Sequence, residues 1–465
     1  MSPEAEPGSF RDPRSRVFLA DGEVLRAFTA QGWEEHEAVA GSAFFADLLA
    51  SRAVIGTETA GPEVLASLPG DWAGVVRHER IDPITYPYEW SFEMLRDAAL
   101  LQLDVVRRAL AEGFTSKDAT PFNVQFEGSR PVFIDVGSFE RLEPGAPWPG
   151  YRQLCEQFLN PLVLQAVGGL PFQPRLRGSM RGIAPSEVAP LLRGRARFDR
   201  RLLVHVAVHA RSERTHAADD PREVAGELRR AGFGPAVLAA QVRNLERTIR
   251  SLRWRRAESA WSGYGARPHY SDDDLAAKEA VVERSVRDVG PDLVLDLGAN
   301  DGRFSRVAVG AGARRAVAAD SDALVVDLLY RQLRDEGDDR ILPLVDLADP
   351  SPAQGWRHLE RRSFTDRLRP DLVLALAVVH HLALTDTVPF EGIVAFLADL
   401  GAPLVVELPH REDPMVQLLL ARKRSGLFDH YEIGAWEAAL EARFDVDERV
   451  ELPSGTRTLY RCRPR

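Results

Sequence analysis

The chain has 465 residues, which exceeds the size of one hydrophobic core, so we expect at least two domains. Its hydrophobic fraction of 45% excludes a disordered or fibrous class. The formal net charge of −10 argues against nucleic acid or an anionic membrane as a partner. Cys155 and Cys462 lie far apart and in no metal-binding spacing, and no apolar stretch is long enough to cross a bilayer. We therefore expect a cytoplasmic protein without a disulfide framework or a metal site.

The first part of the chain predicts a mixture of short strands and helices. Residues 1–15 are polar and rich in proline, and we expect a flexible N-terminus there. Residues 91–113 predict one long helix, because apolar side chains recur at helical spacing and Gly113 ends the run. The other elements expected up to residue 256 are strands at 16–20, 72–76, 123–126 and 132–134, a helix near 43–51, and a mostly helical stretch from 148 that includes 237–256.

From about residue 257 the pattern changes to apolar strands that alternate with helices. The expected strands are 293–297, 315–320, 341–345, 372–377 and 404–407. This alternation predicts a parallel sheet covered by helices on both faces. We therefore expect an α/β Rossmann-like domain over residues 257–465, preceded by an α+β and helical region over residues 16–256.

The strongest motif is a glycine-bearing turn directly after the strand at 293–297. Gly298 and Gly302 allow a tight turn and a close approach of the backbone to a ligand, and Asp296 ends the strand. A dinucleotide site favours G-x-G-x-x-G, whereas Asn300 stands where its second glycine would be. Because Asp301 adds a second acid, the turn suits a cationic ligand better than a pyrophosphate.

This turn resembles the D-x-G-x-x-x-G motif of class I methyltransferases, whose loop holds the methionine moiety of S-adenosylmethionine. The resemblance implies that Asp296, Gly298, Asn300 and Gly302 bind this cofactor. It further implies that Asp320, at the end of the next strand, holds the ribose hydroxyls. Asp346 and Leu347, at the end of the third strand, would contact the adenine. A Rossmann-like fold with another ligand is the alternative.

His380 and His381 follow the fourth strand. The resemblance places such a pair beside the transferred methyl group, where a neutral imidazole could take a proton from an acceptor hydroxyl. The alternative is a histidine that packs under the sheet and binds backbone. Residues 378–382 contain no Asn/Asp-Pro-Pro-Tyr, which disfavours a DNA amino-methyltransferase. Glu407, after the fifth strand, lines either an acceptor pocket or a surface loop.

A second motif lies in the N-terminal region. Asp118 precedes Asn123 by five residues, and Asp135 follows a short hairpin in Asp-Val-Gly. This resembles the catalytic segment of protein-kinase-like enzymes, in which such residues act as the base and hold magnesium. No lysine precedes Lys117, so only arginines such as Arg26 could replace the nucleotide-binding lysine. We interpret the region as a kinase-like remnant that serves as a binding or scaffolding module. The alternatives are an active phosphotransferase and a chance resemblance.

The whole chain also resembles bacterial nodulation-type methyltransferases, on the segments 86–91 (Tyr-Pro-Tyr-Glu-Trp-Ser) and 413–416 (Asp-Pro-Met-Val). This resemblance does not identify the acceptor. Our first hypothesis is a cytoplasmic enzyme that transfers methyl from S-adenosylmethionine to an oxygen of a small-molecule or glycan-like acceptor. The alternatives are a bifunctional kinase–methyltransferase and a protein that binds the cofactor without turnover. The identity of the acceptor and the oligomeric state stay open.

Overall fold

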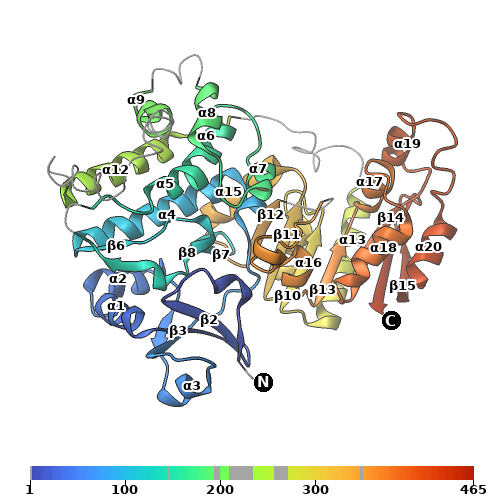
Figure 1. Cartoon of the computed structure of the whole chain (residues 1–465). Coiled ribbons are helices and arrows are strands. Elements are labelled where there is room, and N and C mark those ends of the chain that lie inside the picture. The colour runs from blue at the N-terminus through green and yellow to red at the C-terminus, as the bar shows by residue number, and fades with distance from the viewer. Residues whose placement is uncertain (1–2, 144–145, 193–198, 209–233, 256–270, 346–348) are drawn as a thin grey trace. The chain divides into compact units, whose positions relative to one another are not determined.

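The computed structural model describes residues 3–143, 146–192, 199–208, 234–255, 271–345 and 349–465. The chain forms two compact units (Figure 1). Unit 1 comprises Met1–Arg255 and Ala353–Arg361, and unit 2 comprises Arg256–Pro352 and Arg362–Arg465. The short segment Ala353–Arg361 thus interrupts the sequence of unit 2 but packs with unit 1.

Unit 1 begins with a five-stranded antiparallel sheet in the order β1-β2-β3-β5-β4. The strands are β1 (Glu4–Ala5), β2 (Ser15–Ala20), β3 (Glu23–Phe28), β4 (Thr57–Thr59) and β5 (Gly74–His78). Phe18, Leu25 and Val75 are buried on one face of this sheet and pack against Leu68. The helices α1 (Ala30–Ala40), α2 (Ala43–Ala50) and α3 (Pro62–Ser67) connect the strands.

The long helix α4 (Phe92–Ala111) is the next element of unit 1. Ser91 caps it by accepting a hydrogen bond from the Met94 amide, which satisfies one of the free N–H groups of the first turn. Two antiparallel pairs follow: β6 (Phe114–Ser116) with β9 (Phe139–Arg141), and β7 (Val124–Glu127) with β8 (Arg130–Phe133). The remaining α-helices described in unit 1 are α5 (Tyr151–Leu154), α6 (Asn160–Ala166), α7 (Gln173–Gly178), α8 (Pro185–Val188), α9 (Arg200–Leu202) and α12 (Pro235–Ser251).

Unit 2 contains a seven-stranded sheet in the order β12-β11-β10-β13-β14-β16-β15. Its strands are β10 (Leu293–Leu297), β11 (Arg315–Asp320), β12 (Ile341–Val345), β13 (Leu372–Ala375), β14 (Leu404–Pro409), β15 (Phe444–Glu451) and β16 (Arg457–Pro464). All neighbours among β10–β14 pair in parallel, while β16 is antiparallel to both β14 and β15. The expected Rossmann-like α/β fold of the C-terminal part is confirmed.

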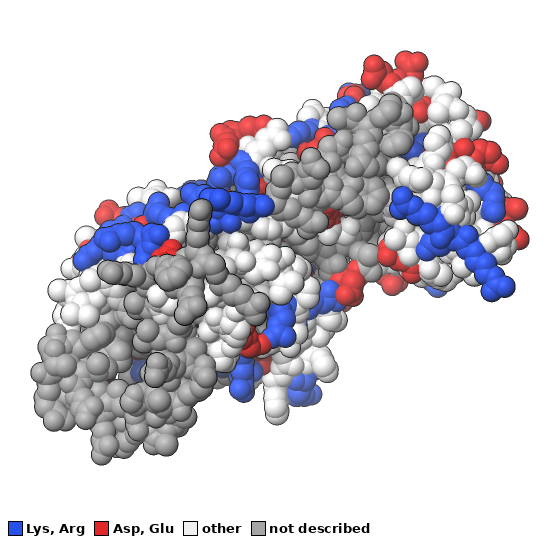
Figure 2. Space-filling view, turned by 90° about the horizontal axis from the view of Figure 1, so that it is seen from above, with Lys and Arg blue, Asp and Glu red and all other residues white. Residues whose placement is uncertain are grey.

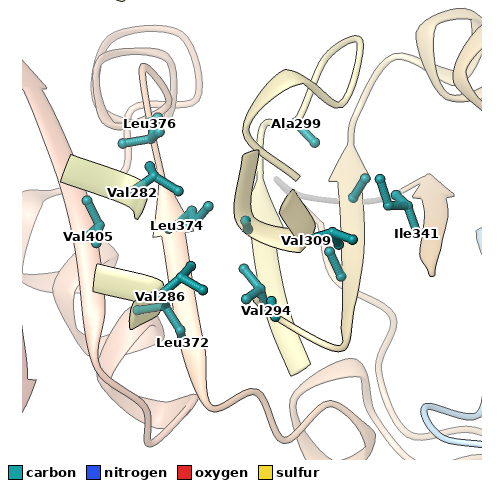
Figure 3. Packing of buried hydrophobic residues seen from close by; sticks show 14 of the residues in the cluster. Val282, Val286, Val294, Ala299, Val309, Ile341, Leu372, Leu374, Leu376 and Val405 are labelled. Atoms are coloured by element: carbon teal, nitrogen blue, oxygen red, sulfur yellow. The ribbon is translucent and has the colours of Figure 1, made fainter. Parts of the chain in front are cut away.

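Helices cover this sheet on both faces, as the burial of every residue of β10, β13 and β14 requires. The α-helices described in unit 2 are α13 (Asp272–Val289), α14 (Arg303–Gly310), α15 (Ala323–Glu336), α16 (Phe364–Arg367), α17 (Val379–Leu384), α18 (Phe390–Asp399), α19 (Pro414–Leu420) and α20 (Ile433–Glu441). In Figure 3, Val282 and Val286 of α13 point towards Leu372 and Leu374 of β13 and Val405 of β14. These side chains belong to one buried apolar cluster, which fixes α13 against the centre of the sheet.

Charged groups of both signs occur on the described part of the face shown in Figure 2. The net charge of −10 is therefore not gathered in one acidic surface on this face. Among the described helices, none is both long and apolar enough to span a bilayer.

Candidate functional site

The turn between β10 and α14 has the backbone geometry that its glycines permit. Gly298, Asn300 and Gly302 have φ angles of 75°, 48° and 77°, in the left-handed region that favours glycine and tolerates asparagine. The amides of Gly298 and Ala299 donate to the carbonyl of Ala319 on β11, at 2.9 and 3.1 Å. A Cβ at Gly302 would lie 2.9 Å from Leu329 Cδ1 and force that side chain to shift, so both the conformation and the space favour glycine there.

Asp296 lies near the end of β10 with its side chain buried, at 1% exposure. One carboxylate oxygen accepts a hydrogen bond from the Ser305 hydroxyl on α14, at 2.7 Å. Burial raises the pKa of Asp296 to about 7, because a charged carboxylate loses hydration there. Within the described residues no cation pairs with this carboxylate, so a cationic ligand would favour its charged form.

Asp320 ends β11 and binds the glycine turn directly. Its Oδ2 accepts from the Asn300 amide and its Oδ1 from the Asp322 amide, both at 2.9 Å. Burial raises the pKa of Asp320 above its usual range, although these two hydrogen bonds oppose the shift. Asp346 and Leu347, which the sequence assigns to adenine, lie outside the described residues.

The register of the sheet brings the carboxyl-terminal parts of four strands to one level, although β14 continues beyond it to Pro409. The residues paired along that level are Ala319, Leu297, Ala375 and Val406. Asp320 on β11 and Glu407 on β14 are the next residues along their strands. The glycine turn, Asp320, Glu407 and the start of α17 therefore share the carboxyl edge of the sheet, where ligands bind in open α/β folds.

His380 and His381 open α17, just beyond β13. Their ring centroids are 4.0 Å apart. His380 is fully buried, and neither of its ring nitrogens has a hydrogen-bond partner among the described residues. Burial holds the pKa of His380 well below its usual range, and burial with the charge of Arg457 lowers the pKa of His381 to about 4. Both rings are therefore neutral at pH 7. The alternative expectation was that the ring of one histidine hydrogen-bonds to the backbone. The ring of His380 makes no such bond to a described residue.

Glu407 lies within β14 and is fully buried, so its placement in a surface loop was wrong. The strand extends to Pro409 because β16 pairs with it over its whole length. Glu407 belongs to a linear chain of four buried charges, which we call the ion chain: Asp413, Arg457, Glu407 and Lys278. Arg457 binds both oxygens of Asp413 at 2.6 and 3.1 Å and Glu407 Oε1 at 2.9 Å. Lys278 Nζ lies 2.7 Å from Glu407 Oε2.

Sequence reasoning missed Lys278 and Arg457. A signal for Lys278 was present, because it stands four residues before Val282 on the apolar face of α13 and is one of only three lysines. Arg457 gave no such signal. It meets Glu407 because β16 returns beside β14, and these two strands lie far apart in the sequence.

The kinase-like residues of unit 1 also lie close together. Asn123 donates to Asp118 Oδ1 at 2.7 Å, and Arg26 on β3 pairs with Asp135 at 2.7 Å. Burial, with the nearby charge of Asp135, raises the pKa of Asp118 to about 7. Among the described residues, no group of three or more His, Cys, Asp or Glu side chains is placed to hold a metal ion.

The fold and the carboxyl edge together define the class of unit 2. In chain order its strands are arranged 3-2-1-4-5-7-6 with the seventh reversed, which is the arrangement of the class I methyltransferase fold. Over 455 residues, the chain is 33% identical to nodulation protein NoeA of Rhizobium meliloti (strain 1021). The alignment covers 97% of this chain and 94% of NoeA. The chain therefore belongs to the NoeA family of nodulation proteins.

Structural comparison gives weaker similarities. The PH0226 protein of Pyrococcus horikoshii OT3 matches with a TM-score of 0.32 and 12% identity, covering 44% of this chain and 99% of PH0226. The N-methyltransferase NodS of Bradyrhizobium japonicum WM9 matches with a TM-score of 0.30 and 13% identity, covering 42% of this chain and 98% of NodS. No protein-family model matches the chain.

Proposed function

We propose that unit 2 binds S-adenosylmethionine at the carboxyl edge of its sheet and transfers the methyl group to an oxygen of a small-molecule or glycan-like acceptor. The observation that carries the proposal is the hydrogen bond from the Asn300 amide to Asp320, which ties the glycine turn to the acid on the next strand. The turn is thereby flanked by the carboxyl groups of Asp296 and Asp320. Two carboxylates suit a cationic, hydroxyl-bearing ligand and repel a pyrophosphate.

The residues at the carboxyl edge suit the methionine, ribose and adenine moieties of the cofactor in turn. Asp296 would bind the ammonium group of the methionine moiety, and this positive charge would offset the burial of the carboxylate. Each oxygen of Asp320 accepts one backbone hydrogen bond and keeps a lone pair for a ribose hydroxyl. Gly298 and Gly302 would let the backbone approach the ligand closely. Asp346 and Leu347 would contact the adenine, as the class I resemblance implies.

The chemistry at the acceptor follows from the neutral state of the two histidines. When bound, S-adenosylmethionine supplies an electrophilic methyl group and is left as S-adenosylhomocysteine. His380 or His381 would accept the proton that the acceptor hydroxyl loses as its oxygen bonds to the methyl carbon, and would pass it on to solvent. A neutral imidazole has the free lone pair that this step requires.

Isothermal titration with S-adenosylhomocysteine tests the cofactor assignment. We expect micromolar binding to the wild type and a loss of at least tenfold in Asp296→Ala. The matched control is Asp292→Ala, which removes an acid just before the opposite end of the same strand and should bind normally. Absence of binding to the folded wild type would refute the proposal. Binding without any methylated product in cell extracts would favour a protein that holds the cofactor without turnover.

We further propose that unit 1 is a kinase-like module that serves for binding or scaffolding and does not transfer phosphate. The support is the pairing of β6 with β9 and of β7 with β8, which brings Asp118, Asn123 and Asp135 together. An active phosphotransferase is not favoured, because Asp135 is paired with Arg26 and Asn123 is bound to Asp118. Titration with ATP and magnesium should show no magnesium-dependent binding, and tight binding would restore the bifunctional alternative.

A further inference from the structure

The position of Lys278 follows from the way α13 lies on the sheet. Asp274, Lys278, Val282 and Val286 are spaced four apart and are all buried, so they form one row on the sheet-facing side of the helix. Val286 packs near Leu372, at the start of β13, and Val282 packs further along that strand (Figure 3). The row therefore runs towards the carboxyl edge, and Lys278 lies one turn beyond Val282. Its Nζ is 6.0 Å from the ring of Phe304, directly after the glycine turn.

Burial of the ion chain is expensive, and stability does not explain it. All four side chains are at most 2% exposed, and their charges sum to zero. Desolvation of buried ions cancels most of their mutual attraction, so well-packed apolar residues would hold the fold at least as well. The chain ends at Lys278, beside Phe304 of α14, and its middle residue Glu407 lies on β14, the strand against which α17 packs. The ion chain therefore places a charge-balanced set of buried ions at the carboxyl edge.

His380 is the polar group that this environment acts on. The charged and titratable groups that influence it come from three elements: His381 on α17, Arg457 on β16 and Lys278 on α13. Glu407 on β14 and Asp413 before α19 pair with these cations. Because both ring nitrogens of His380 lack a partner among the described residues, a bound ligand is the natural partner for this buried imidazole.

We propose that Lys278 and Arg457 are positioning residues of the methyl-transfer site, whose positive charges, held in place by Glu407, keep His380 and His381 neutral and ready to accept a hydrogen bond from the methyl acceptor. The acceptor group is accordingly one that carries a hydrogen to donate, a hydroxyl or an amine, and not a carboxylate. This inference rests on the proposed function of unit 2.

The test follows the titration of the two imidazoles in the full-length chain by ¹⁵N-histidine NMR, with assignments from His380→Gln and His381→Gln. In the wild type, neither ring should take up a proton above pH 5. In Lys278→Met, the ion chain carries one net negative charge, because Arg457 alone then faces both Glu407 and Asp413, so the pKa of at least one ring should rise by about 1 unit or more. In the double variant Lys278→Met/Glu407→Gln, the pair is removed as a neutral unit, and the titration should return close to that of the wild type.

Two control variants separate this role from a merely structural one. Lys278→Arg keeps the positive charge and should titrate as the wild type does. Lys423→Met removes a lysine that lies over Phe428 in the same unit, and it should change nothing. If Lys278→Met does not fold, Glu407→Gln supplies the second measurement: both rings should stay neutral down to pH 5 because the cations remain.

Binding of S-adenosylhomocysteine, measured on the same samples, distinguishes the two possible failures. Normal binding in Lys278→Met with shifted histidines supports the inference. Normal binding with unshifted histidines in Lys278→Met overturns it and leaves the cofactor assignment intact. The inference is also overturned if the double variant keeps the altered histidine titration of Lys278→Met instead of returning to that of the wild type. No binding to the wild type refutes the proposed function, whatever the histidines do.

Discussion

Replacement of Gly302 by alanine tests the physical reason for the glycine turn. The change places a Cβ on a residue with φ of 77°, and that Cβ would meet Leu329 Cδ1 at 2.9 Å and Cδ2 at 3.0 Å. A left-handed conformation costs a non-glycine residue about 1–2 kcal/mol. Crowding in a packed core adds about 1–3 kcal/mol, since Leu329 is 3% exposed and cannot move freely.

Gly337 provides a matched control for the first of these two terms. It ends α15 with φ of 69°, and a Cβ there would meet nothing within 4 Å. Gly337→Ala should therefore cost only the conformational part, about 1–2 kcal/mol. The difference between the two variants isolates the contact with Leu329, about 1–3 kcal/mol.

Hydrogen exchange with mass spectrometry measures this difference locally in a chain with two units. Peptides from β10 and α14 should exchange about 5- to 150-fold faster in Gly302→Ala than in Gly337→Ala, since about 1.4 kcal/mol corresponds to a factor of ten. Gly302→Ala should also weaken S-adenosylhomocysteine binding, which Gly337→Ala should not. Equal exchange in the two variants would refute the claim that Leu329 closes this position.

Three further changes test other parts of the molecule. Asp296→Asn should raise the stability of unit 2 at pH 8 by up to about 4 kcal/mol and leave it unchanged at pH 3.5. The reason is that the buried carboxyl group of Asp296 keeps its proton up to about pH 7 in the folded state but loses it near pH 4 in the unfolded state. Thermal denaturation at the two pH values checks this. Arg457→Met should destabilise unit 2 by about 3–5 kcal/mol in the same exchange assay, whereas Arg461→Met, on the same strand but partly exposed, should cost about 1 kcal/mol or less. Glu360→Ala should speed tryptic cleavage within the segment Ala353–Arg361, because its buried carboxylate binds an arginine and a backbone amide, while the exposed Glu58→Ala should not.

The strands of the parallel sheet could be predicted well from local sequence. The expected bounds of the first three match β10, β11 and β12, because each is a short, continuous apolar run with a clear end. The fourth was placed two residues too long. It ends at Ala375 because Ala377 adopts φ of 55°, which breaks the extended backbone before α17.

The antiparallel pair β15–β16 could not be predicted in the same way. β15 (Phe444–Glu451) is an edge strand with alternate residues exposed, and it carries several charges. The register shifts between Val446 and Glu448, so one residue of β15 has no partner on β16 and the ladder is locally irregular. Edge strands are charged because this prevents association with other chains, and the same charges hide them from a search for apolar runs.

The candidate site also has a part that the sequence predicts, a local motif, and a part that it does not, a set of long-range contacts. The turn after β10 is encoded by residues that follow one another, so the sequence alone indicates it. The ion chain joins α13, β14, β16 and the residue before α19, and no local pattern connects these elements. Of the residues in the ion chain, Lys278 is the one that broke a local rule, as a buried charge in line with Val282 and Val286 on α13, and such exceptions are expected at functional sites.

The two edges of the sheet differ in how their polar groups are satisfied, and this difference favours the carboxyl edge as the ligand site. At the opposite edge, a shallow hollow is lined by Asp292, Asp371 and neighbouring small residues. There Asp371 accepts hydrogen bonds from two backbone amides, and Asp292 pairs with Arg315. At the carboxyl edge, by contrast, burial raises the pKa of Asp296 and lowers that of His380. A buried acid and a buried base that are each shifted towards their neutral forms cost stability, and such groups are retained where a ligand or a reaction uses them.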